Sequence, residues 1–316
     1  LVEKSKKNEF LTYLKKEKQK IILHLTNLNI KNLINKTSNN NSFKKIYFCN
    51  DGCDFLLAKI LKEKPKNELP LNIEKKYYRE IYKCRKCNHY LNESFLNNIK
   101  NYYEGKYVAN TYGNMLKVNN IFKKIIKLPK NKSDNKNRVQ RIKNYFTNFS
   151  IDKNKIKVLD IGSGIGVFLY ELKKQTKWNC SGLDPDKLQS DHMNNFLKIK
   201  NFNSTLENFK FKKKFNFITI NKVLEHQKNP VKFLNESLKN LTTNGYVYLE
   251  VPDGEFAEKY GKSIIENEEF FIEHFHVFSL RSLVSLIEKT NLSILNIERI
   301  KEPSGKFTLC SFCKIN

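Results

Sequence analysis

The chain has 316 residues, of which 40% are hydrophobic and 12% aromatic, and its formal net charge is +26. This length suits about two domains, and the apolar content is sufficient for a buried core, which excludes a disordered chain. No stretch reaches the roughly 18 apolar residues of a membrane-spanning helix, and the charged residues 1–20 lack the apolar part of a signal peptide. We therefore expect a soluble, cytoplasmic protein with no membrane span.

The positive charge suggests a nucleic-acid partner, but the residue types favour a simpler interpretation. Only six of the 58 basic residues are Arg, and Asn is abundant along the chain. Nucleic-acid-binding proteins favour Arg for bidentate contacts with bases and phosphates, whereas a diffuse Lys excess is typical of a solvated surface. Nucleic acid is therefore the less favoured partner, and phosphorylated small molecules are compatible with the same charge.

Two segments precede the second half of the chain. Apolar residues recur at helical spacing within the Lys-rich residues 1–45, which predicts a partly helical, basic N-terminal segment. Residues 46–150 follow as a module with four Cys and many Tyr, and the polar stretch 130–137 is typical of a linker. The pattern of residues 137–149 then predicts an amphipathic helix that leads into the next domain.

Paired Cys indicate a metal site in this module. The pairs at metal-binding spacing are Cys49-x-x-x-Cys53 and Cys84-x-x-Cys87. Four thiolates from two such pairs fit a structural zinc site, which has no open position and therefore serves folding. His89 is an alternative ligand, and Asn88 stands where the turn needs a left-handed backbone. Free Cys packed in a core are the simpler alternative.

From residue 151 onward, predicted strands alternate with predicted helices. We expect strands at 158–161, 180–183, 215–220, 246–251, 295–300 and 307–312, and helices at 167–174, at 231–241 and after Ser279. This alternation predicts an α/β domain over residues 151–316 with a mostly parallel, doubly wound, Rossmann-like sheet. Cys310 and Cys313 lie in the last strand, where their thiols point to opposite faces, and we interpret them as packing residues.

A glycine-rich turn joins the first predicted strand of this domain to its first helix. Glycines allow a tight turn and a close ligand approach, and the free amides of a helix N-terminus bind carboxylate or phosphate groups. The spacing from Gly162 is Gly-x-Gly-x-Gly with Asp160 two residues earlier, which differs from the Gly-x-Gly-x-x-Gly of dinucleotide-binding folds. The next strand ends at Asp184, where a carboxylate can accept hydrogen bonds from both hydroxyls of a ribose.

The turn, Asp160 and Asp184 together resemble the first motifs of class I S-adenosylmethionine-dependent methyltransferases. The resemblance continues through the Leu-Glu-His that ends at His226 and the Pro252 after the next strand, and it covers about residues 155–316. It implies S-adenosylmethionine as the cofactor. The implied binding residues are Asp160, Gly162, Ser163, Gly164, Gly166, Asp184, Asn221 and Lys222. Of these, Asn221 and Lys222 are expected near the methionine end of the cofactor.

Residues 270–279 read Phe-Phe-Ile-Glu-His-Phe-His-Val-Phe-Ser and resemble the Glu-His segment of sugar C-methyltransferases, which act on nucleotide-linked deoxysugars. In that family a His of this segment is the base, which implies this role for His274 with Glu273 as its neighbour. An extended segment would turn His276 to the same face, so the two imidazoles can exchange roles. A structural loop is the simpler alternative for both, and His226 is interpreted as structural.

The sugar C-methyltransferases also carry a zinc-binding module, followed by Tyr residues that reach the substrate. The resemblance therefore implies bound zinc for the four Cys and substrate contacts for Tyr103, Tyr107 and Tyr112. That family has a further C-terminal domain, whereas this chain ends soon after its last predicted strand, which leaves the acceptor atom open.

We therefore predict an enzyme that transfers a methyl group from S-adenosylmethionine to a small-molecule acceptor, such as a nucleotide-linked sugar or a related phosphorylated metabolite. An RNA-modifying methyltransferase that uses the basic N-terminal segment is one alternative, favoured by the charge. Against it, the chain lacks the Asn/Asp-Pro-Pro-aromatic element of amino-directed adenine methyltransferases. A non-catalytic, methyltransferase-like binding module is the other alternative, and the intact glycine turn with Asp184 argues against it.

Overall fold

The computed structural model describes residues 52–65, 68, 77–94, 113–261, 263–264 and 266–316. The predictions for residues 1–45, for Cys49 and for Tyr103, Tyr107 and Tyr112 lie outside these residues. Residues 46–316 form one compact unit. Within its described part, no helix combines the length and the apolar character needed to cross a bilayer.

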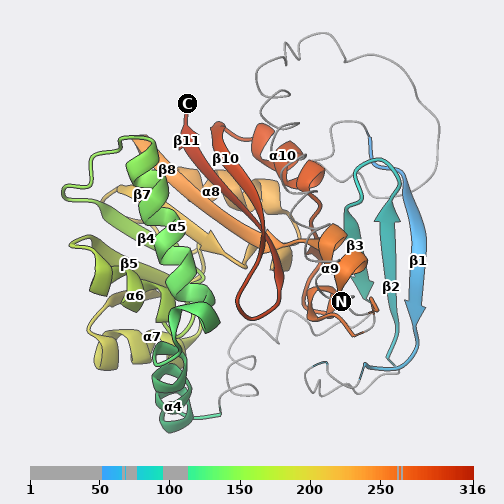
Figure 1. Ribbon diagram of the computed structural model, residues 1–316, viewed down its shortest axis with the longest axis horizontal. Coiled ribbons are helices and arrows are strands. Elements are labelled where there is room, and N and C mark those ends of the chain that lie inside the picture. The colour runs from blue at the N-terminus through green and yellow to red at the C-terminus, as the bar shows by residue number, and fades with distance from the viewer. Residues whose placement is uncertain (1–51, 66–67, 69–76, 95–112, 262, 265) are drawn as a thin grey trace. The chain divides into compact units, whose positions relative to one another are not determined.

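The larger of two sheets has seven strands in the order β10–β11–β8–β7–β4–β5–β6 (Figure 1). Strands β6, β5, β4, β7 and β8 run parallel, whereas β11 is antiparallel to both β8 and β10. The predicted Rossmann-like α/β sheet is therefore confirmed, with its last strand reversed. The bounds are β4 (Lys157–Ile161), β5 (Asn179–Asp184), β6 (Lys200–Asn203), β7 (Phe215–Asn221), β8 (Leu241–Pro252), β10 (Leu292–Lys301) and β11 (Phe307–Ile315).

Helices connect these strands and cover the sheet. They are α4 (Met115–Ile126), α5 (Asp134–Asn148), α6 (Val167–Gln175), α7 (Lys187–Asp191), α8 (Pro230–Leu238), α9 (Gly254–Tyr260) and α10 (Leu280–Glu288). Shorter helical turns are η3 (Lys130–Lys132), η4 (His192–Leu197), η5 (Leu224–His226) and η6 (Glu268–Phe270). Ser279 caps α10 as predicted, and its capping box with Ser282 satisfies amides at the helix start.

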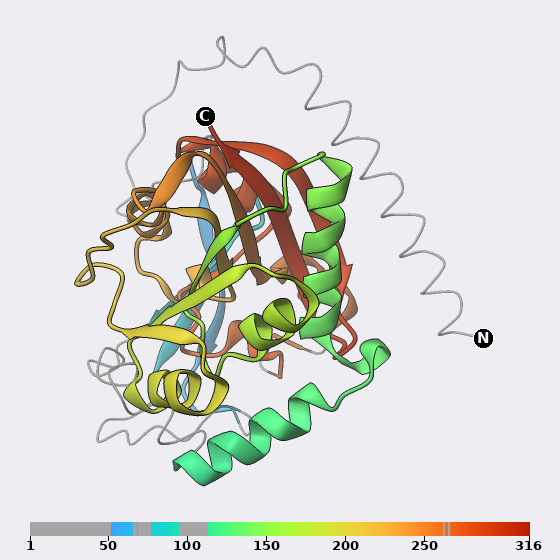
Figure 2. The same cartoon turned by 90° about the vertical axis from the view of Figure 1, so that its left-hand side faces the viewer.

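Helix α5 begins earlier than its apolar pattern predicts. The predicted linker 130–137 contains η3 and the first turn of α5, because Ser133 accepts a hydrogen bond from the Lys136 amide at 3.3 Å and caps the helix there. Figure 2 shows α5 along the strands and α4 crossing below it. The apolar face of α5 is buried in the core through residues that include Ile142 and Phe146.

The core between α5, α6 and the sheet is rich in aromatic side chains. Phe146 packs edge-on against Phe217 of β7, with ring centroids 5.1 Å apart, and Phe312 of β11 stacks on Tyr145 at 5.0 Å. Cys310 belongs to this core, and Cys313 is also fully buried. The prediction that these two Cys are packing residues is confirmed, because both thiols are enclosed by the fold.

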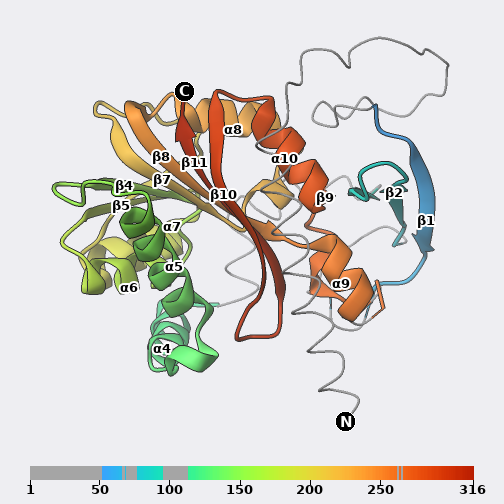
Figure 3. The same cartoon turned by 45° about the horizontal axis from the view of Figure 1, so that its top comes forward.

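A second, four-stranded sheet has the order β1–β2–β3–β9 and is antiparallel throughout. Its strands are β1 (Phe55–Leu61), β2 (Arg79–Cys84), β3 (Tyr90–Ser94) and β9 (His276–Val277). Strand β9 therefore comes from the second half of the chain, after α9. Figure 3 shows α9 and α10 between the two sheets, where Lys83 pairs with Glu258 and Arg281 binds the carbonyl of Lys86.

Candidate functional site

The glycine-rich turn adopts a backbone that side chains would obstruct. Gly162, Gly164 and Gly166 have φ angles of +75°, +54° and +78°, a region that glycine enters without strain. A Cβ on Gly162 would lie 2.4 Å from Cγ2 of Val223, and one on Gly166 would lie 2.8 Å from Cγ of Met193. The turn therefore needs glycine for both conformation and space, and it delivers the chain to the N-terminus of α6.

Asp184 lies at the end of β5 and folds against the glycine turn. Its Oδ2 accepts a hydrogen bond from the Gly164 amide and its Oδ1 accepts one from the Asp186 amide, both at 2.9 Å. Burial raises the pKa of this carboxyl to about 6, although the two amide bonds favour the charged form. A ligand that donates hydrogen bonds to Asp184 is therefore bound best above this pH.

Asp160 connects β4 to β7 beside the turn. Its Oδ1 accepts hydrogen bonds from Thr219 Oγ1 at 2.6 Å and from Asn221 Nδ2 at 2.8 Å. Burial raises the pKa of Asp160 to about 7 against these bonds. Asn221 is thereby fixed, and its buried Oδ1 has no hydrogen-bond partner among the described residues. An orphaned acceptor of this kind indicates a donor on a ligand.

The side chain of Ser163 turns into the protein. Its hydroxyl donates to Asn201 Oδ1 at 2.8 Å, and the residue is 8% exposed. The same region is tight around Gly182, where a Cβ would lie 2.6 Å from Ser163 Oγ. Its backbone is also used within the protein, since its amide donates to the Leu183 carbonyl and its carbonyl accepts from the Gly166 amide. Of the predicted cofactor residues, Ser163 therefore supports the turn.

A cavity of about 560 Å³ opens at the ends of β7, β8 and β11. It is lined by seven carboxylate side chains but by three Lys or Arg, in a chain whose net charge is +26. The acidic residues are Asp134, Glu225, Glu250, Glu268, Glu269, Glu273 and Glu302, and the basic ones are Arg138, Lys222 and Lys306. Two of the basic side chains, Arg138 and Lys306, are already paired with Glu250 and Glu268, so the cavity offers a phosphate little uncompensated positive charge and favours a neutral or cationic group.

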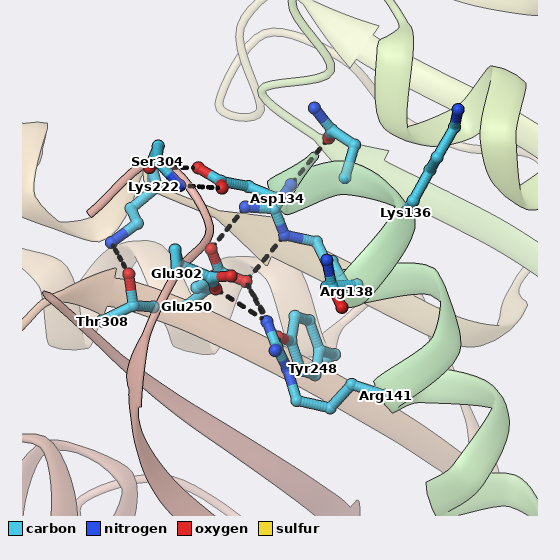
Figure 4. Close-up of polar contacts among 12 residues, drawn as sticks. Asp134, Lys136, Arg138, Arg141, Lys222, Tyr248, Glu250, Glu302, Ser304 and Thr308 are labelled. Carbon is cyan, nitrogen blue, oxygen red and sulfur yellow. Dashed lines mark hydrogen bonds and ion pairs between the residues drawn. The ribbon is translucent and has the colours of Figure 1, made fainter. Parts of the chain in front are cut away.

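A buried ion network forms one wall of the cavity (Figure 4). Arg138 of α5 binds both carboxylate oxygens of Glu250 on β8, with Nε at 2.7 Å from Oε2. Arg141 donates to Glu302 at 2.9 Å and to the hydroxyl of Tyr248 at 3.0 Å. Although burial opposes the charge on Glu250, the Arg138 guanidinium lowers the pKa of this carboxyl below its ordinary value. The network therefore anchors α5 to the end of β8.

Lys222 reaches the same wall from an unusual backbone position. It follows β7 with a φ of +57°, a conformation that costs a non-glycine residue about 1 kcal/mol. Its ammonium donates to Thr308 Oγ1 at 2.8 Å, and its amide donates to the carbonyl of Glu250 at 2.8 Å. Strain retained beside a cavity is typical of functional sites.

His274 and His276 contact different parts of the protein. The backbone turns at Ile272 and Glu273, and the His274 amide donates to the carbonyl of Phe271 at 3.0 Å. The chain also bends at Phe275, between the two His, and their contacts differ, so they do not share a face as expected. His274 lines the cavity and lies against His226, with ring centroids 4.7 Å apart.

His276 lies in β9 on the side of the small sheet. Its Nδ1 is 3.0 Å from His89 Nε2, and the other nitrogen of His89 is 3.0 Å from Ser282 Oγ. Both nitrogens of His89 are thus engaged, which contradicts the alternative of His89 as a metal ligand. Burial lowers the pKa of His276 to about 4. The imidazole of His276 is consequently neutral near pH 7. His276 is also not among the residues that line the cavity.

Burial dominates the titration of the groups around His274. The pKa of His274 is well below its ordinary value, first through burial and then through the neighbouring His226. Burial also lowers the pKa of His226 to about 4 and raises that of Glu225 to about 8. Glu273 is buried as well, and its pKa rises to about 7. Near neutral pH the imidazoles of His226 and His274 are therefore neutral, and one ring nitrogen of each has a lone pair that can bind a proton or a metal.

Three Cys converge between β1 and β2. The thiols of Cys53, Cys84 and Cys87 lie within 4.8 Å of one another, and Cys49, the predicted partner, is outside the described residues. The turn after Cys84 is closed by the Asn88 amide, which donates to the Cys84 carbonyl at 3.0 Å. Asn88 has a φ of +58°, which confirms the left-handed backbone predicted for it. Thiols at this separation can share one ion.

The sequence interpretation missed the residues of the ion network. Glu250 is the one charged residue in the apolar stretch Tyr246–Val251, and Arg138 is one of six Arg in a chain that otherwise uses Lys. A charge within a buried strand needs a partner, and Arg suits a bidentate one. These two signals could have identified the pair, but their contact joins residues 112 positions apart.

A family model described as a methyltransferase domain matches residues 132–297, more than half of the 316-residue chain. The plantazolicin methyltransferase BpumL, solved with SAH, is 16% identical, with a TM-score of 0.49 over 69% of this chain and 98% of that one. A 1,6-didemethyltoxoflavin-N1-methyltransferase from Burkholderia thailandensis is 13% identical, with a TM-score of 0.45 over 58% and 78% of the two chains. No curated protein sequence matches the chain.

Proposed function

Because this chain belongs to the methyltransferase domain family, we propose that it transfers a methyl group from S-adenosylmethionine to a small-molecule acceptor that enters the acidic cavity. The observation that carries this proposal is that the glycine turn and the cavity lie at the same edge of the large sheet. The glycine turn and Asp184 lie at the ends of β4 and β5, and the cavity begins at the end of the neighbouring β7. In open α/β sheets, ligands bind at this edge.

The residues of the turn fit the parts of S-adenosylmethionine. Asp184 would accept hydrogen bonds from the ribose hydroxyls, and the free amides at the start of α6 would face the methionine carboxylate. The orphaned Oδ1 of Asn221 would accept a hydrogen bond from the methionine ammonium. Bound there, the cofactor supplies a methyl group that its sulfonium charge has already activated.

Methyl transfer requires that the acceptor be aligned with the methyl carbon and that the acceptor lose a proton. A lone pair on the acceptor forms the new bond to the methyl carbon, the carbon–sulfur bond breaks, and its electron pair neutralises the sulfonium. The acceptor proton then passes to a neighbouring base. His274 is our candidate, since its Nδ1 is 2.8 Å from the carbonyl of Glu269, which leaves Nε2 as the basic nitrogen.

The acceptor class follows from the charge of the cavity. Arg138 and Lys306 are already paired with Glu250 and Glu268, so we expect a neutral or cationic group at the reactive end of the acceptor. A nucleotide-linked sugar remains our leading acceptor, with its phosphates outside this part of the cavity. For the three convergent Cys, together with Cys49, we propose a structural zinc ion.

The proposal is tested by incubating the purified protein with methyl-labelled cofactor and a lysate of its own host. We expect label in a small, nuclease-resistant fraction, and a loss of at least about 100-fold in rate for His274→Asn. Glu236→Gln is the control, because Glu236 pairs with Lys239 on the surface and does not line the cavity. Label in a ribonuclease-sensitive fraction would move the function to RNA, and absence of S-adenosylhomocysteine binding would refute methyl transfer altogether.

A further inference from the structure

Three side chains that line the cavity converge on one point, although a single general base would be enough to take up a proton. Glu225 and His226 belong to η5, after β7, and His274 belongs to the segment between η6 and β9. Each offers one ligand atom, and the three atoms lie within 4.8 Å of one another. One carboxylate and two imidazoles form a donor set that binds divalent first-row metal ions.

Both imidazoles are held in the orientation typical of metal ligands. The Nδ1 of His226 is 3.0 Å from the carbonyl of Glu273, and the Nδ1 of His274 is 2.8 Å from the carbonyl of Glu269. A carbonyl accepts, so each Nδ1 carries the proton and donates it. Each Nε2 therefore keeps its lone pair, and the carbonyl contact supplies the outer support that metal-binding His usually have.

Glu225 gives an independent indication of a missing cation. The residue is 1% exposed and lines the cavity, and its Oε2 has no hydrogen-bond partner among the described residues. A buried carboxylate oxygen without a donor is costly, and proteins normally satisfy it with a hydrogen bond or an ion.

The surrounding charges are compatible with a second positive charge at this point. Lys222 is a positive charge that acts on Glu225, but its ammonium is held by Thr308 Oγ1 at 2.8 Å. The cavity's seven carboxylates exceed its three Lys and Arg. Arg138 and Lys306 are paired with Glu250 and Glu268. A divalent ion at this point therefore meets little uncompensated positive charge.

We propose that Glu225, His226 and His274 bind one divalent first-row metal ion, with coordination positions left open for an oxygen of the acceptor. The inference rests on the proposed function and deepens it. The ion holds the acceptor oxygen in the cavity and draws electron density from it, so the acceptor hydroxyl releases its proton more readily, to solvent. With the ion bound, Nε2 of His274 is a ligand, and this role replaces the one of general base proposed above for the site without metal.

Manganese is the probe that separates this site from the Cys cluster, because Mn²⁺ prefers oxygen and nitrogen ligands to thiolates. The full chain, dialysed against EDTA, is titrated with Mn²⁺ while electron paramagnetic resonance follows the free ion. We expect one Mn²⁺ bound per chain. Glu225→Gln and His274→Asn should each weaken binding by at least about 10-fold, because even the loss of an outer contact of a metal ligand costs about that much. Glu236→Gln, a surface substitution, should bind Mn²⁺ as the wild type does.

Calorimetric titration of S-adenosylhomocysteine into each variant tests whether the cofactor site is intact. Retained affinity with lost Mn²⁺ binding supports the metal site, and so does methyl transfer that stops in EDTA and returns with Mn²⁺. A wild type that binds no Mn²⁺, or one that transfers methyl groups undiminished in EDTA, overturns the metal site but leaves the proposed methyl transfer standing. Failure to bind S-adenosylhomocysteine would instead remove the proposed function.

Discussion

At the scale of single residues, the conformation of Asp184 depends on the chain on both sides of it. The Gly164 amide comes from the turn before α6, and the Asp186 amide comes from the residue that caps α7. These amides hold the carboxylate at the end of β5, where burial raises its pKa to about 6. The charged form is therefore the one that accepts hydrogen bonds from a ligand, and it is lost as the pH falls.

We expect Asp184→Asn to weaken binding of S-adenosylhomocysteine by about 10- to 100-fold, because an amide cannot replace a charged acceptor for two hydroxyls. In the wild type, affinity should decline as the pH drops through about 6, where the carboxylate becomes protonated. Calorimetric titrations between pH 5 and pH 8 would measure both effects.

Asp191→Asn is the matched control, since Asp191 is a half-exposed residue of α7 that pairs with Lys187. It should bind the cofactor product as the wild type does. An Asp184→Asn variant with wild-type affinity at pH 8 would contradict the role of this carboxylate.

At the scale of elements, α5 is joined to the sheet by charge as well as by packing. Arg138 and Arg141 lie one turn apart on the helix and both reach Glu250, which is fully buried on β8. Removing one member of a buried pair leaves the other charge without compensation, which costs more than the pair contributes. The position of α5 beside the cavity therefore depends on Glu250.

We predict that Glu250→Gln lowers the free energy of unfolding by about 3 kcal/mol, the usual cost of breaking a buried ion pair. Urea unfolding of the full chain would measure it. Glu236→Gln removes a surface partner of Lys239 and should change stability by less than about 1 kcal/mol. Equal effects of the two substitutions would show that the buried network is energetically unimportant.

Elements were predictable from sequence where a local pattern decides the structure, and less so where distant residues do. The strands β4, β7 and β8 contain apolar runs, and the glycine turn identifies its own backbone. Strand β6 was not predicted, because its sequence Lys-Asn-Phe-Asn has no apolar pattern. The start of α5 was missed because the N-cap residue Ser133 sets it, whereas the prediction relied on the apolar residues, which begin later in the helix. Strand β9 could not be foreseen, since its two residues form a strand by pairing with Tyr90 and Leu91, far away in the chain.

At the scale of the whole molecule, most Arg contacts are buried, whereas the ion pairs of the described Lys have Lys side chains that are at least 31% exposed. All six Arg make ion pairs or hydrogen bonds, and Arg79, Arg138, Arg141 and Arg299 do so with side chains that are at most 11% exposed. A planar guanidinium can bind a carboxylate with two parallel bonds, which Lys cannot do. In a chain with so much Lys, the position of Arg is thus a guide to buried contacts.

The Cys cluster makes the small sheet depend on metal, if our proposal for zinc holds. Metal binding that occurs in the folded state alone adds to folding stability. We expect EDTA to lower the melting temperature of the wild type by several degrees and that of Cys84→Ser, already lowered, by clearly less. Differential scanning calorimetry with elemental analysis would test this.

Cys180→Ser is the control for the loss of a buried thiol, because Cys180 lies in β5, away from the cluster. It should remain sensitive to EDTA as the wild type is. Zinc found in the Cys84→Ser variant at the wild-type ratio would contradict the assignment.

The pairing of β9 with β3 has a consequence for any attempt to dissect this protein. Residues 113–316 contain the whole seven-stranded sheet and the glycine turn, and they look self-sufficient by the usual criteria of a domain. Expressed alone, however, this fragment would leave β9 as a bare edge and would uncover Phe270, which packs edge-on against Tyr90 with ring centroids 4.9 Å apart. His274 lies between Phe270 and β9. Truncation would therefore remove the contacts that hold the His274 side of the cavity, while the contacts of the glycine turn would stay intact.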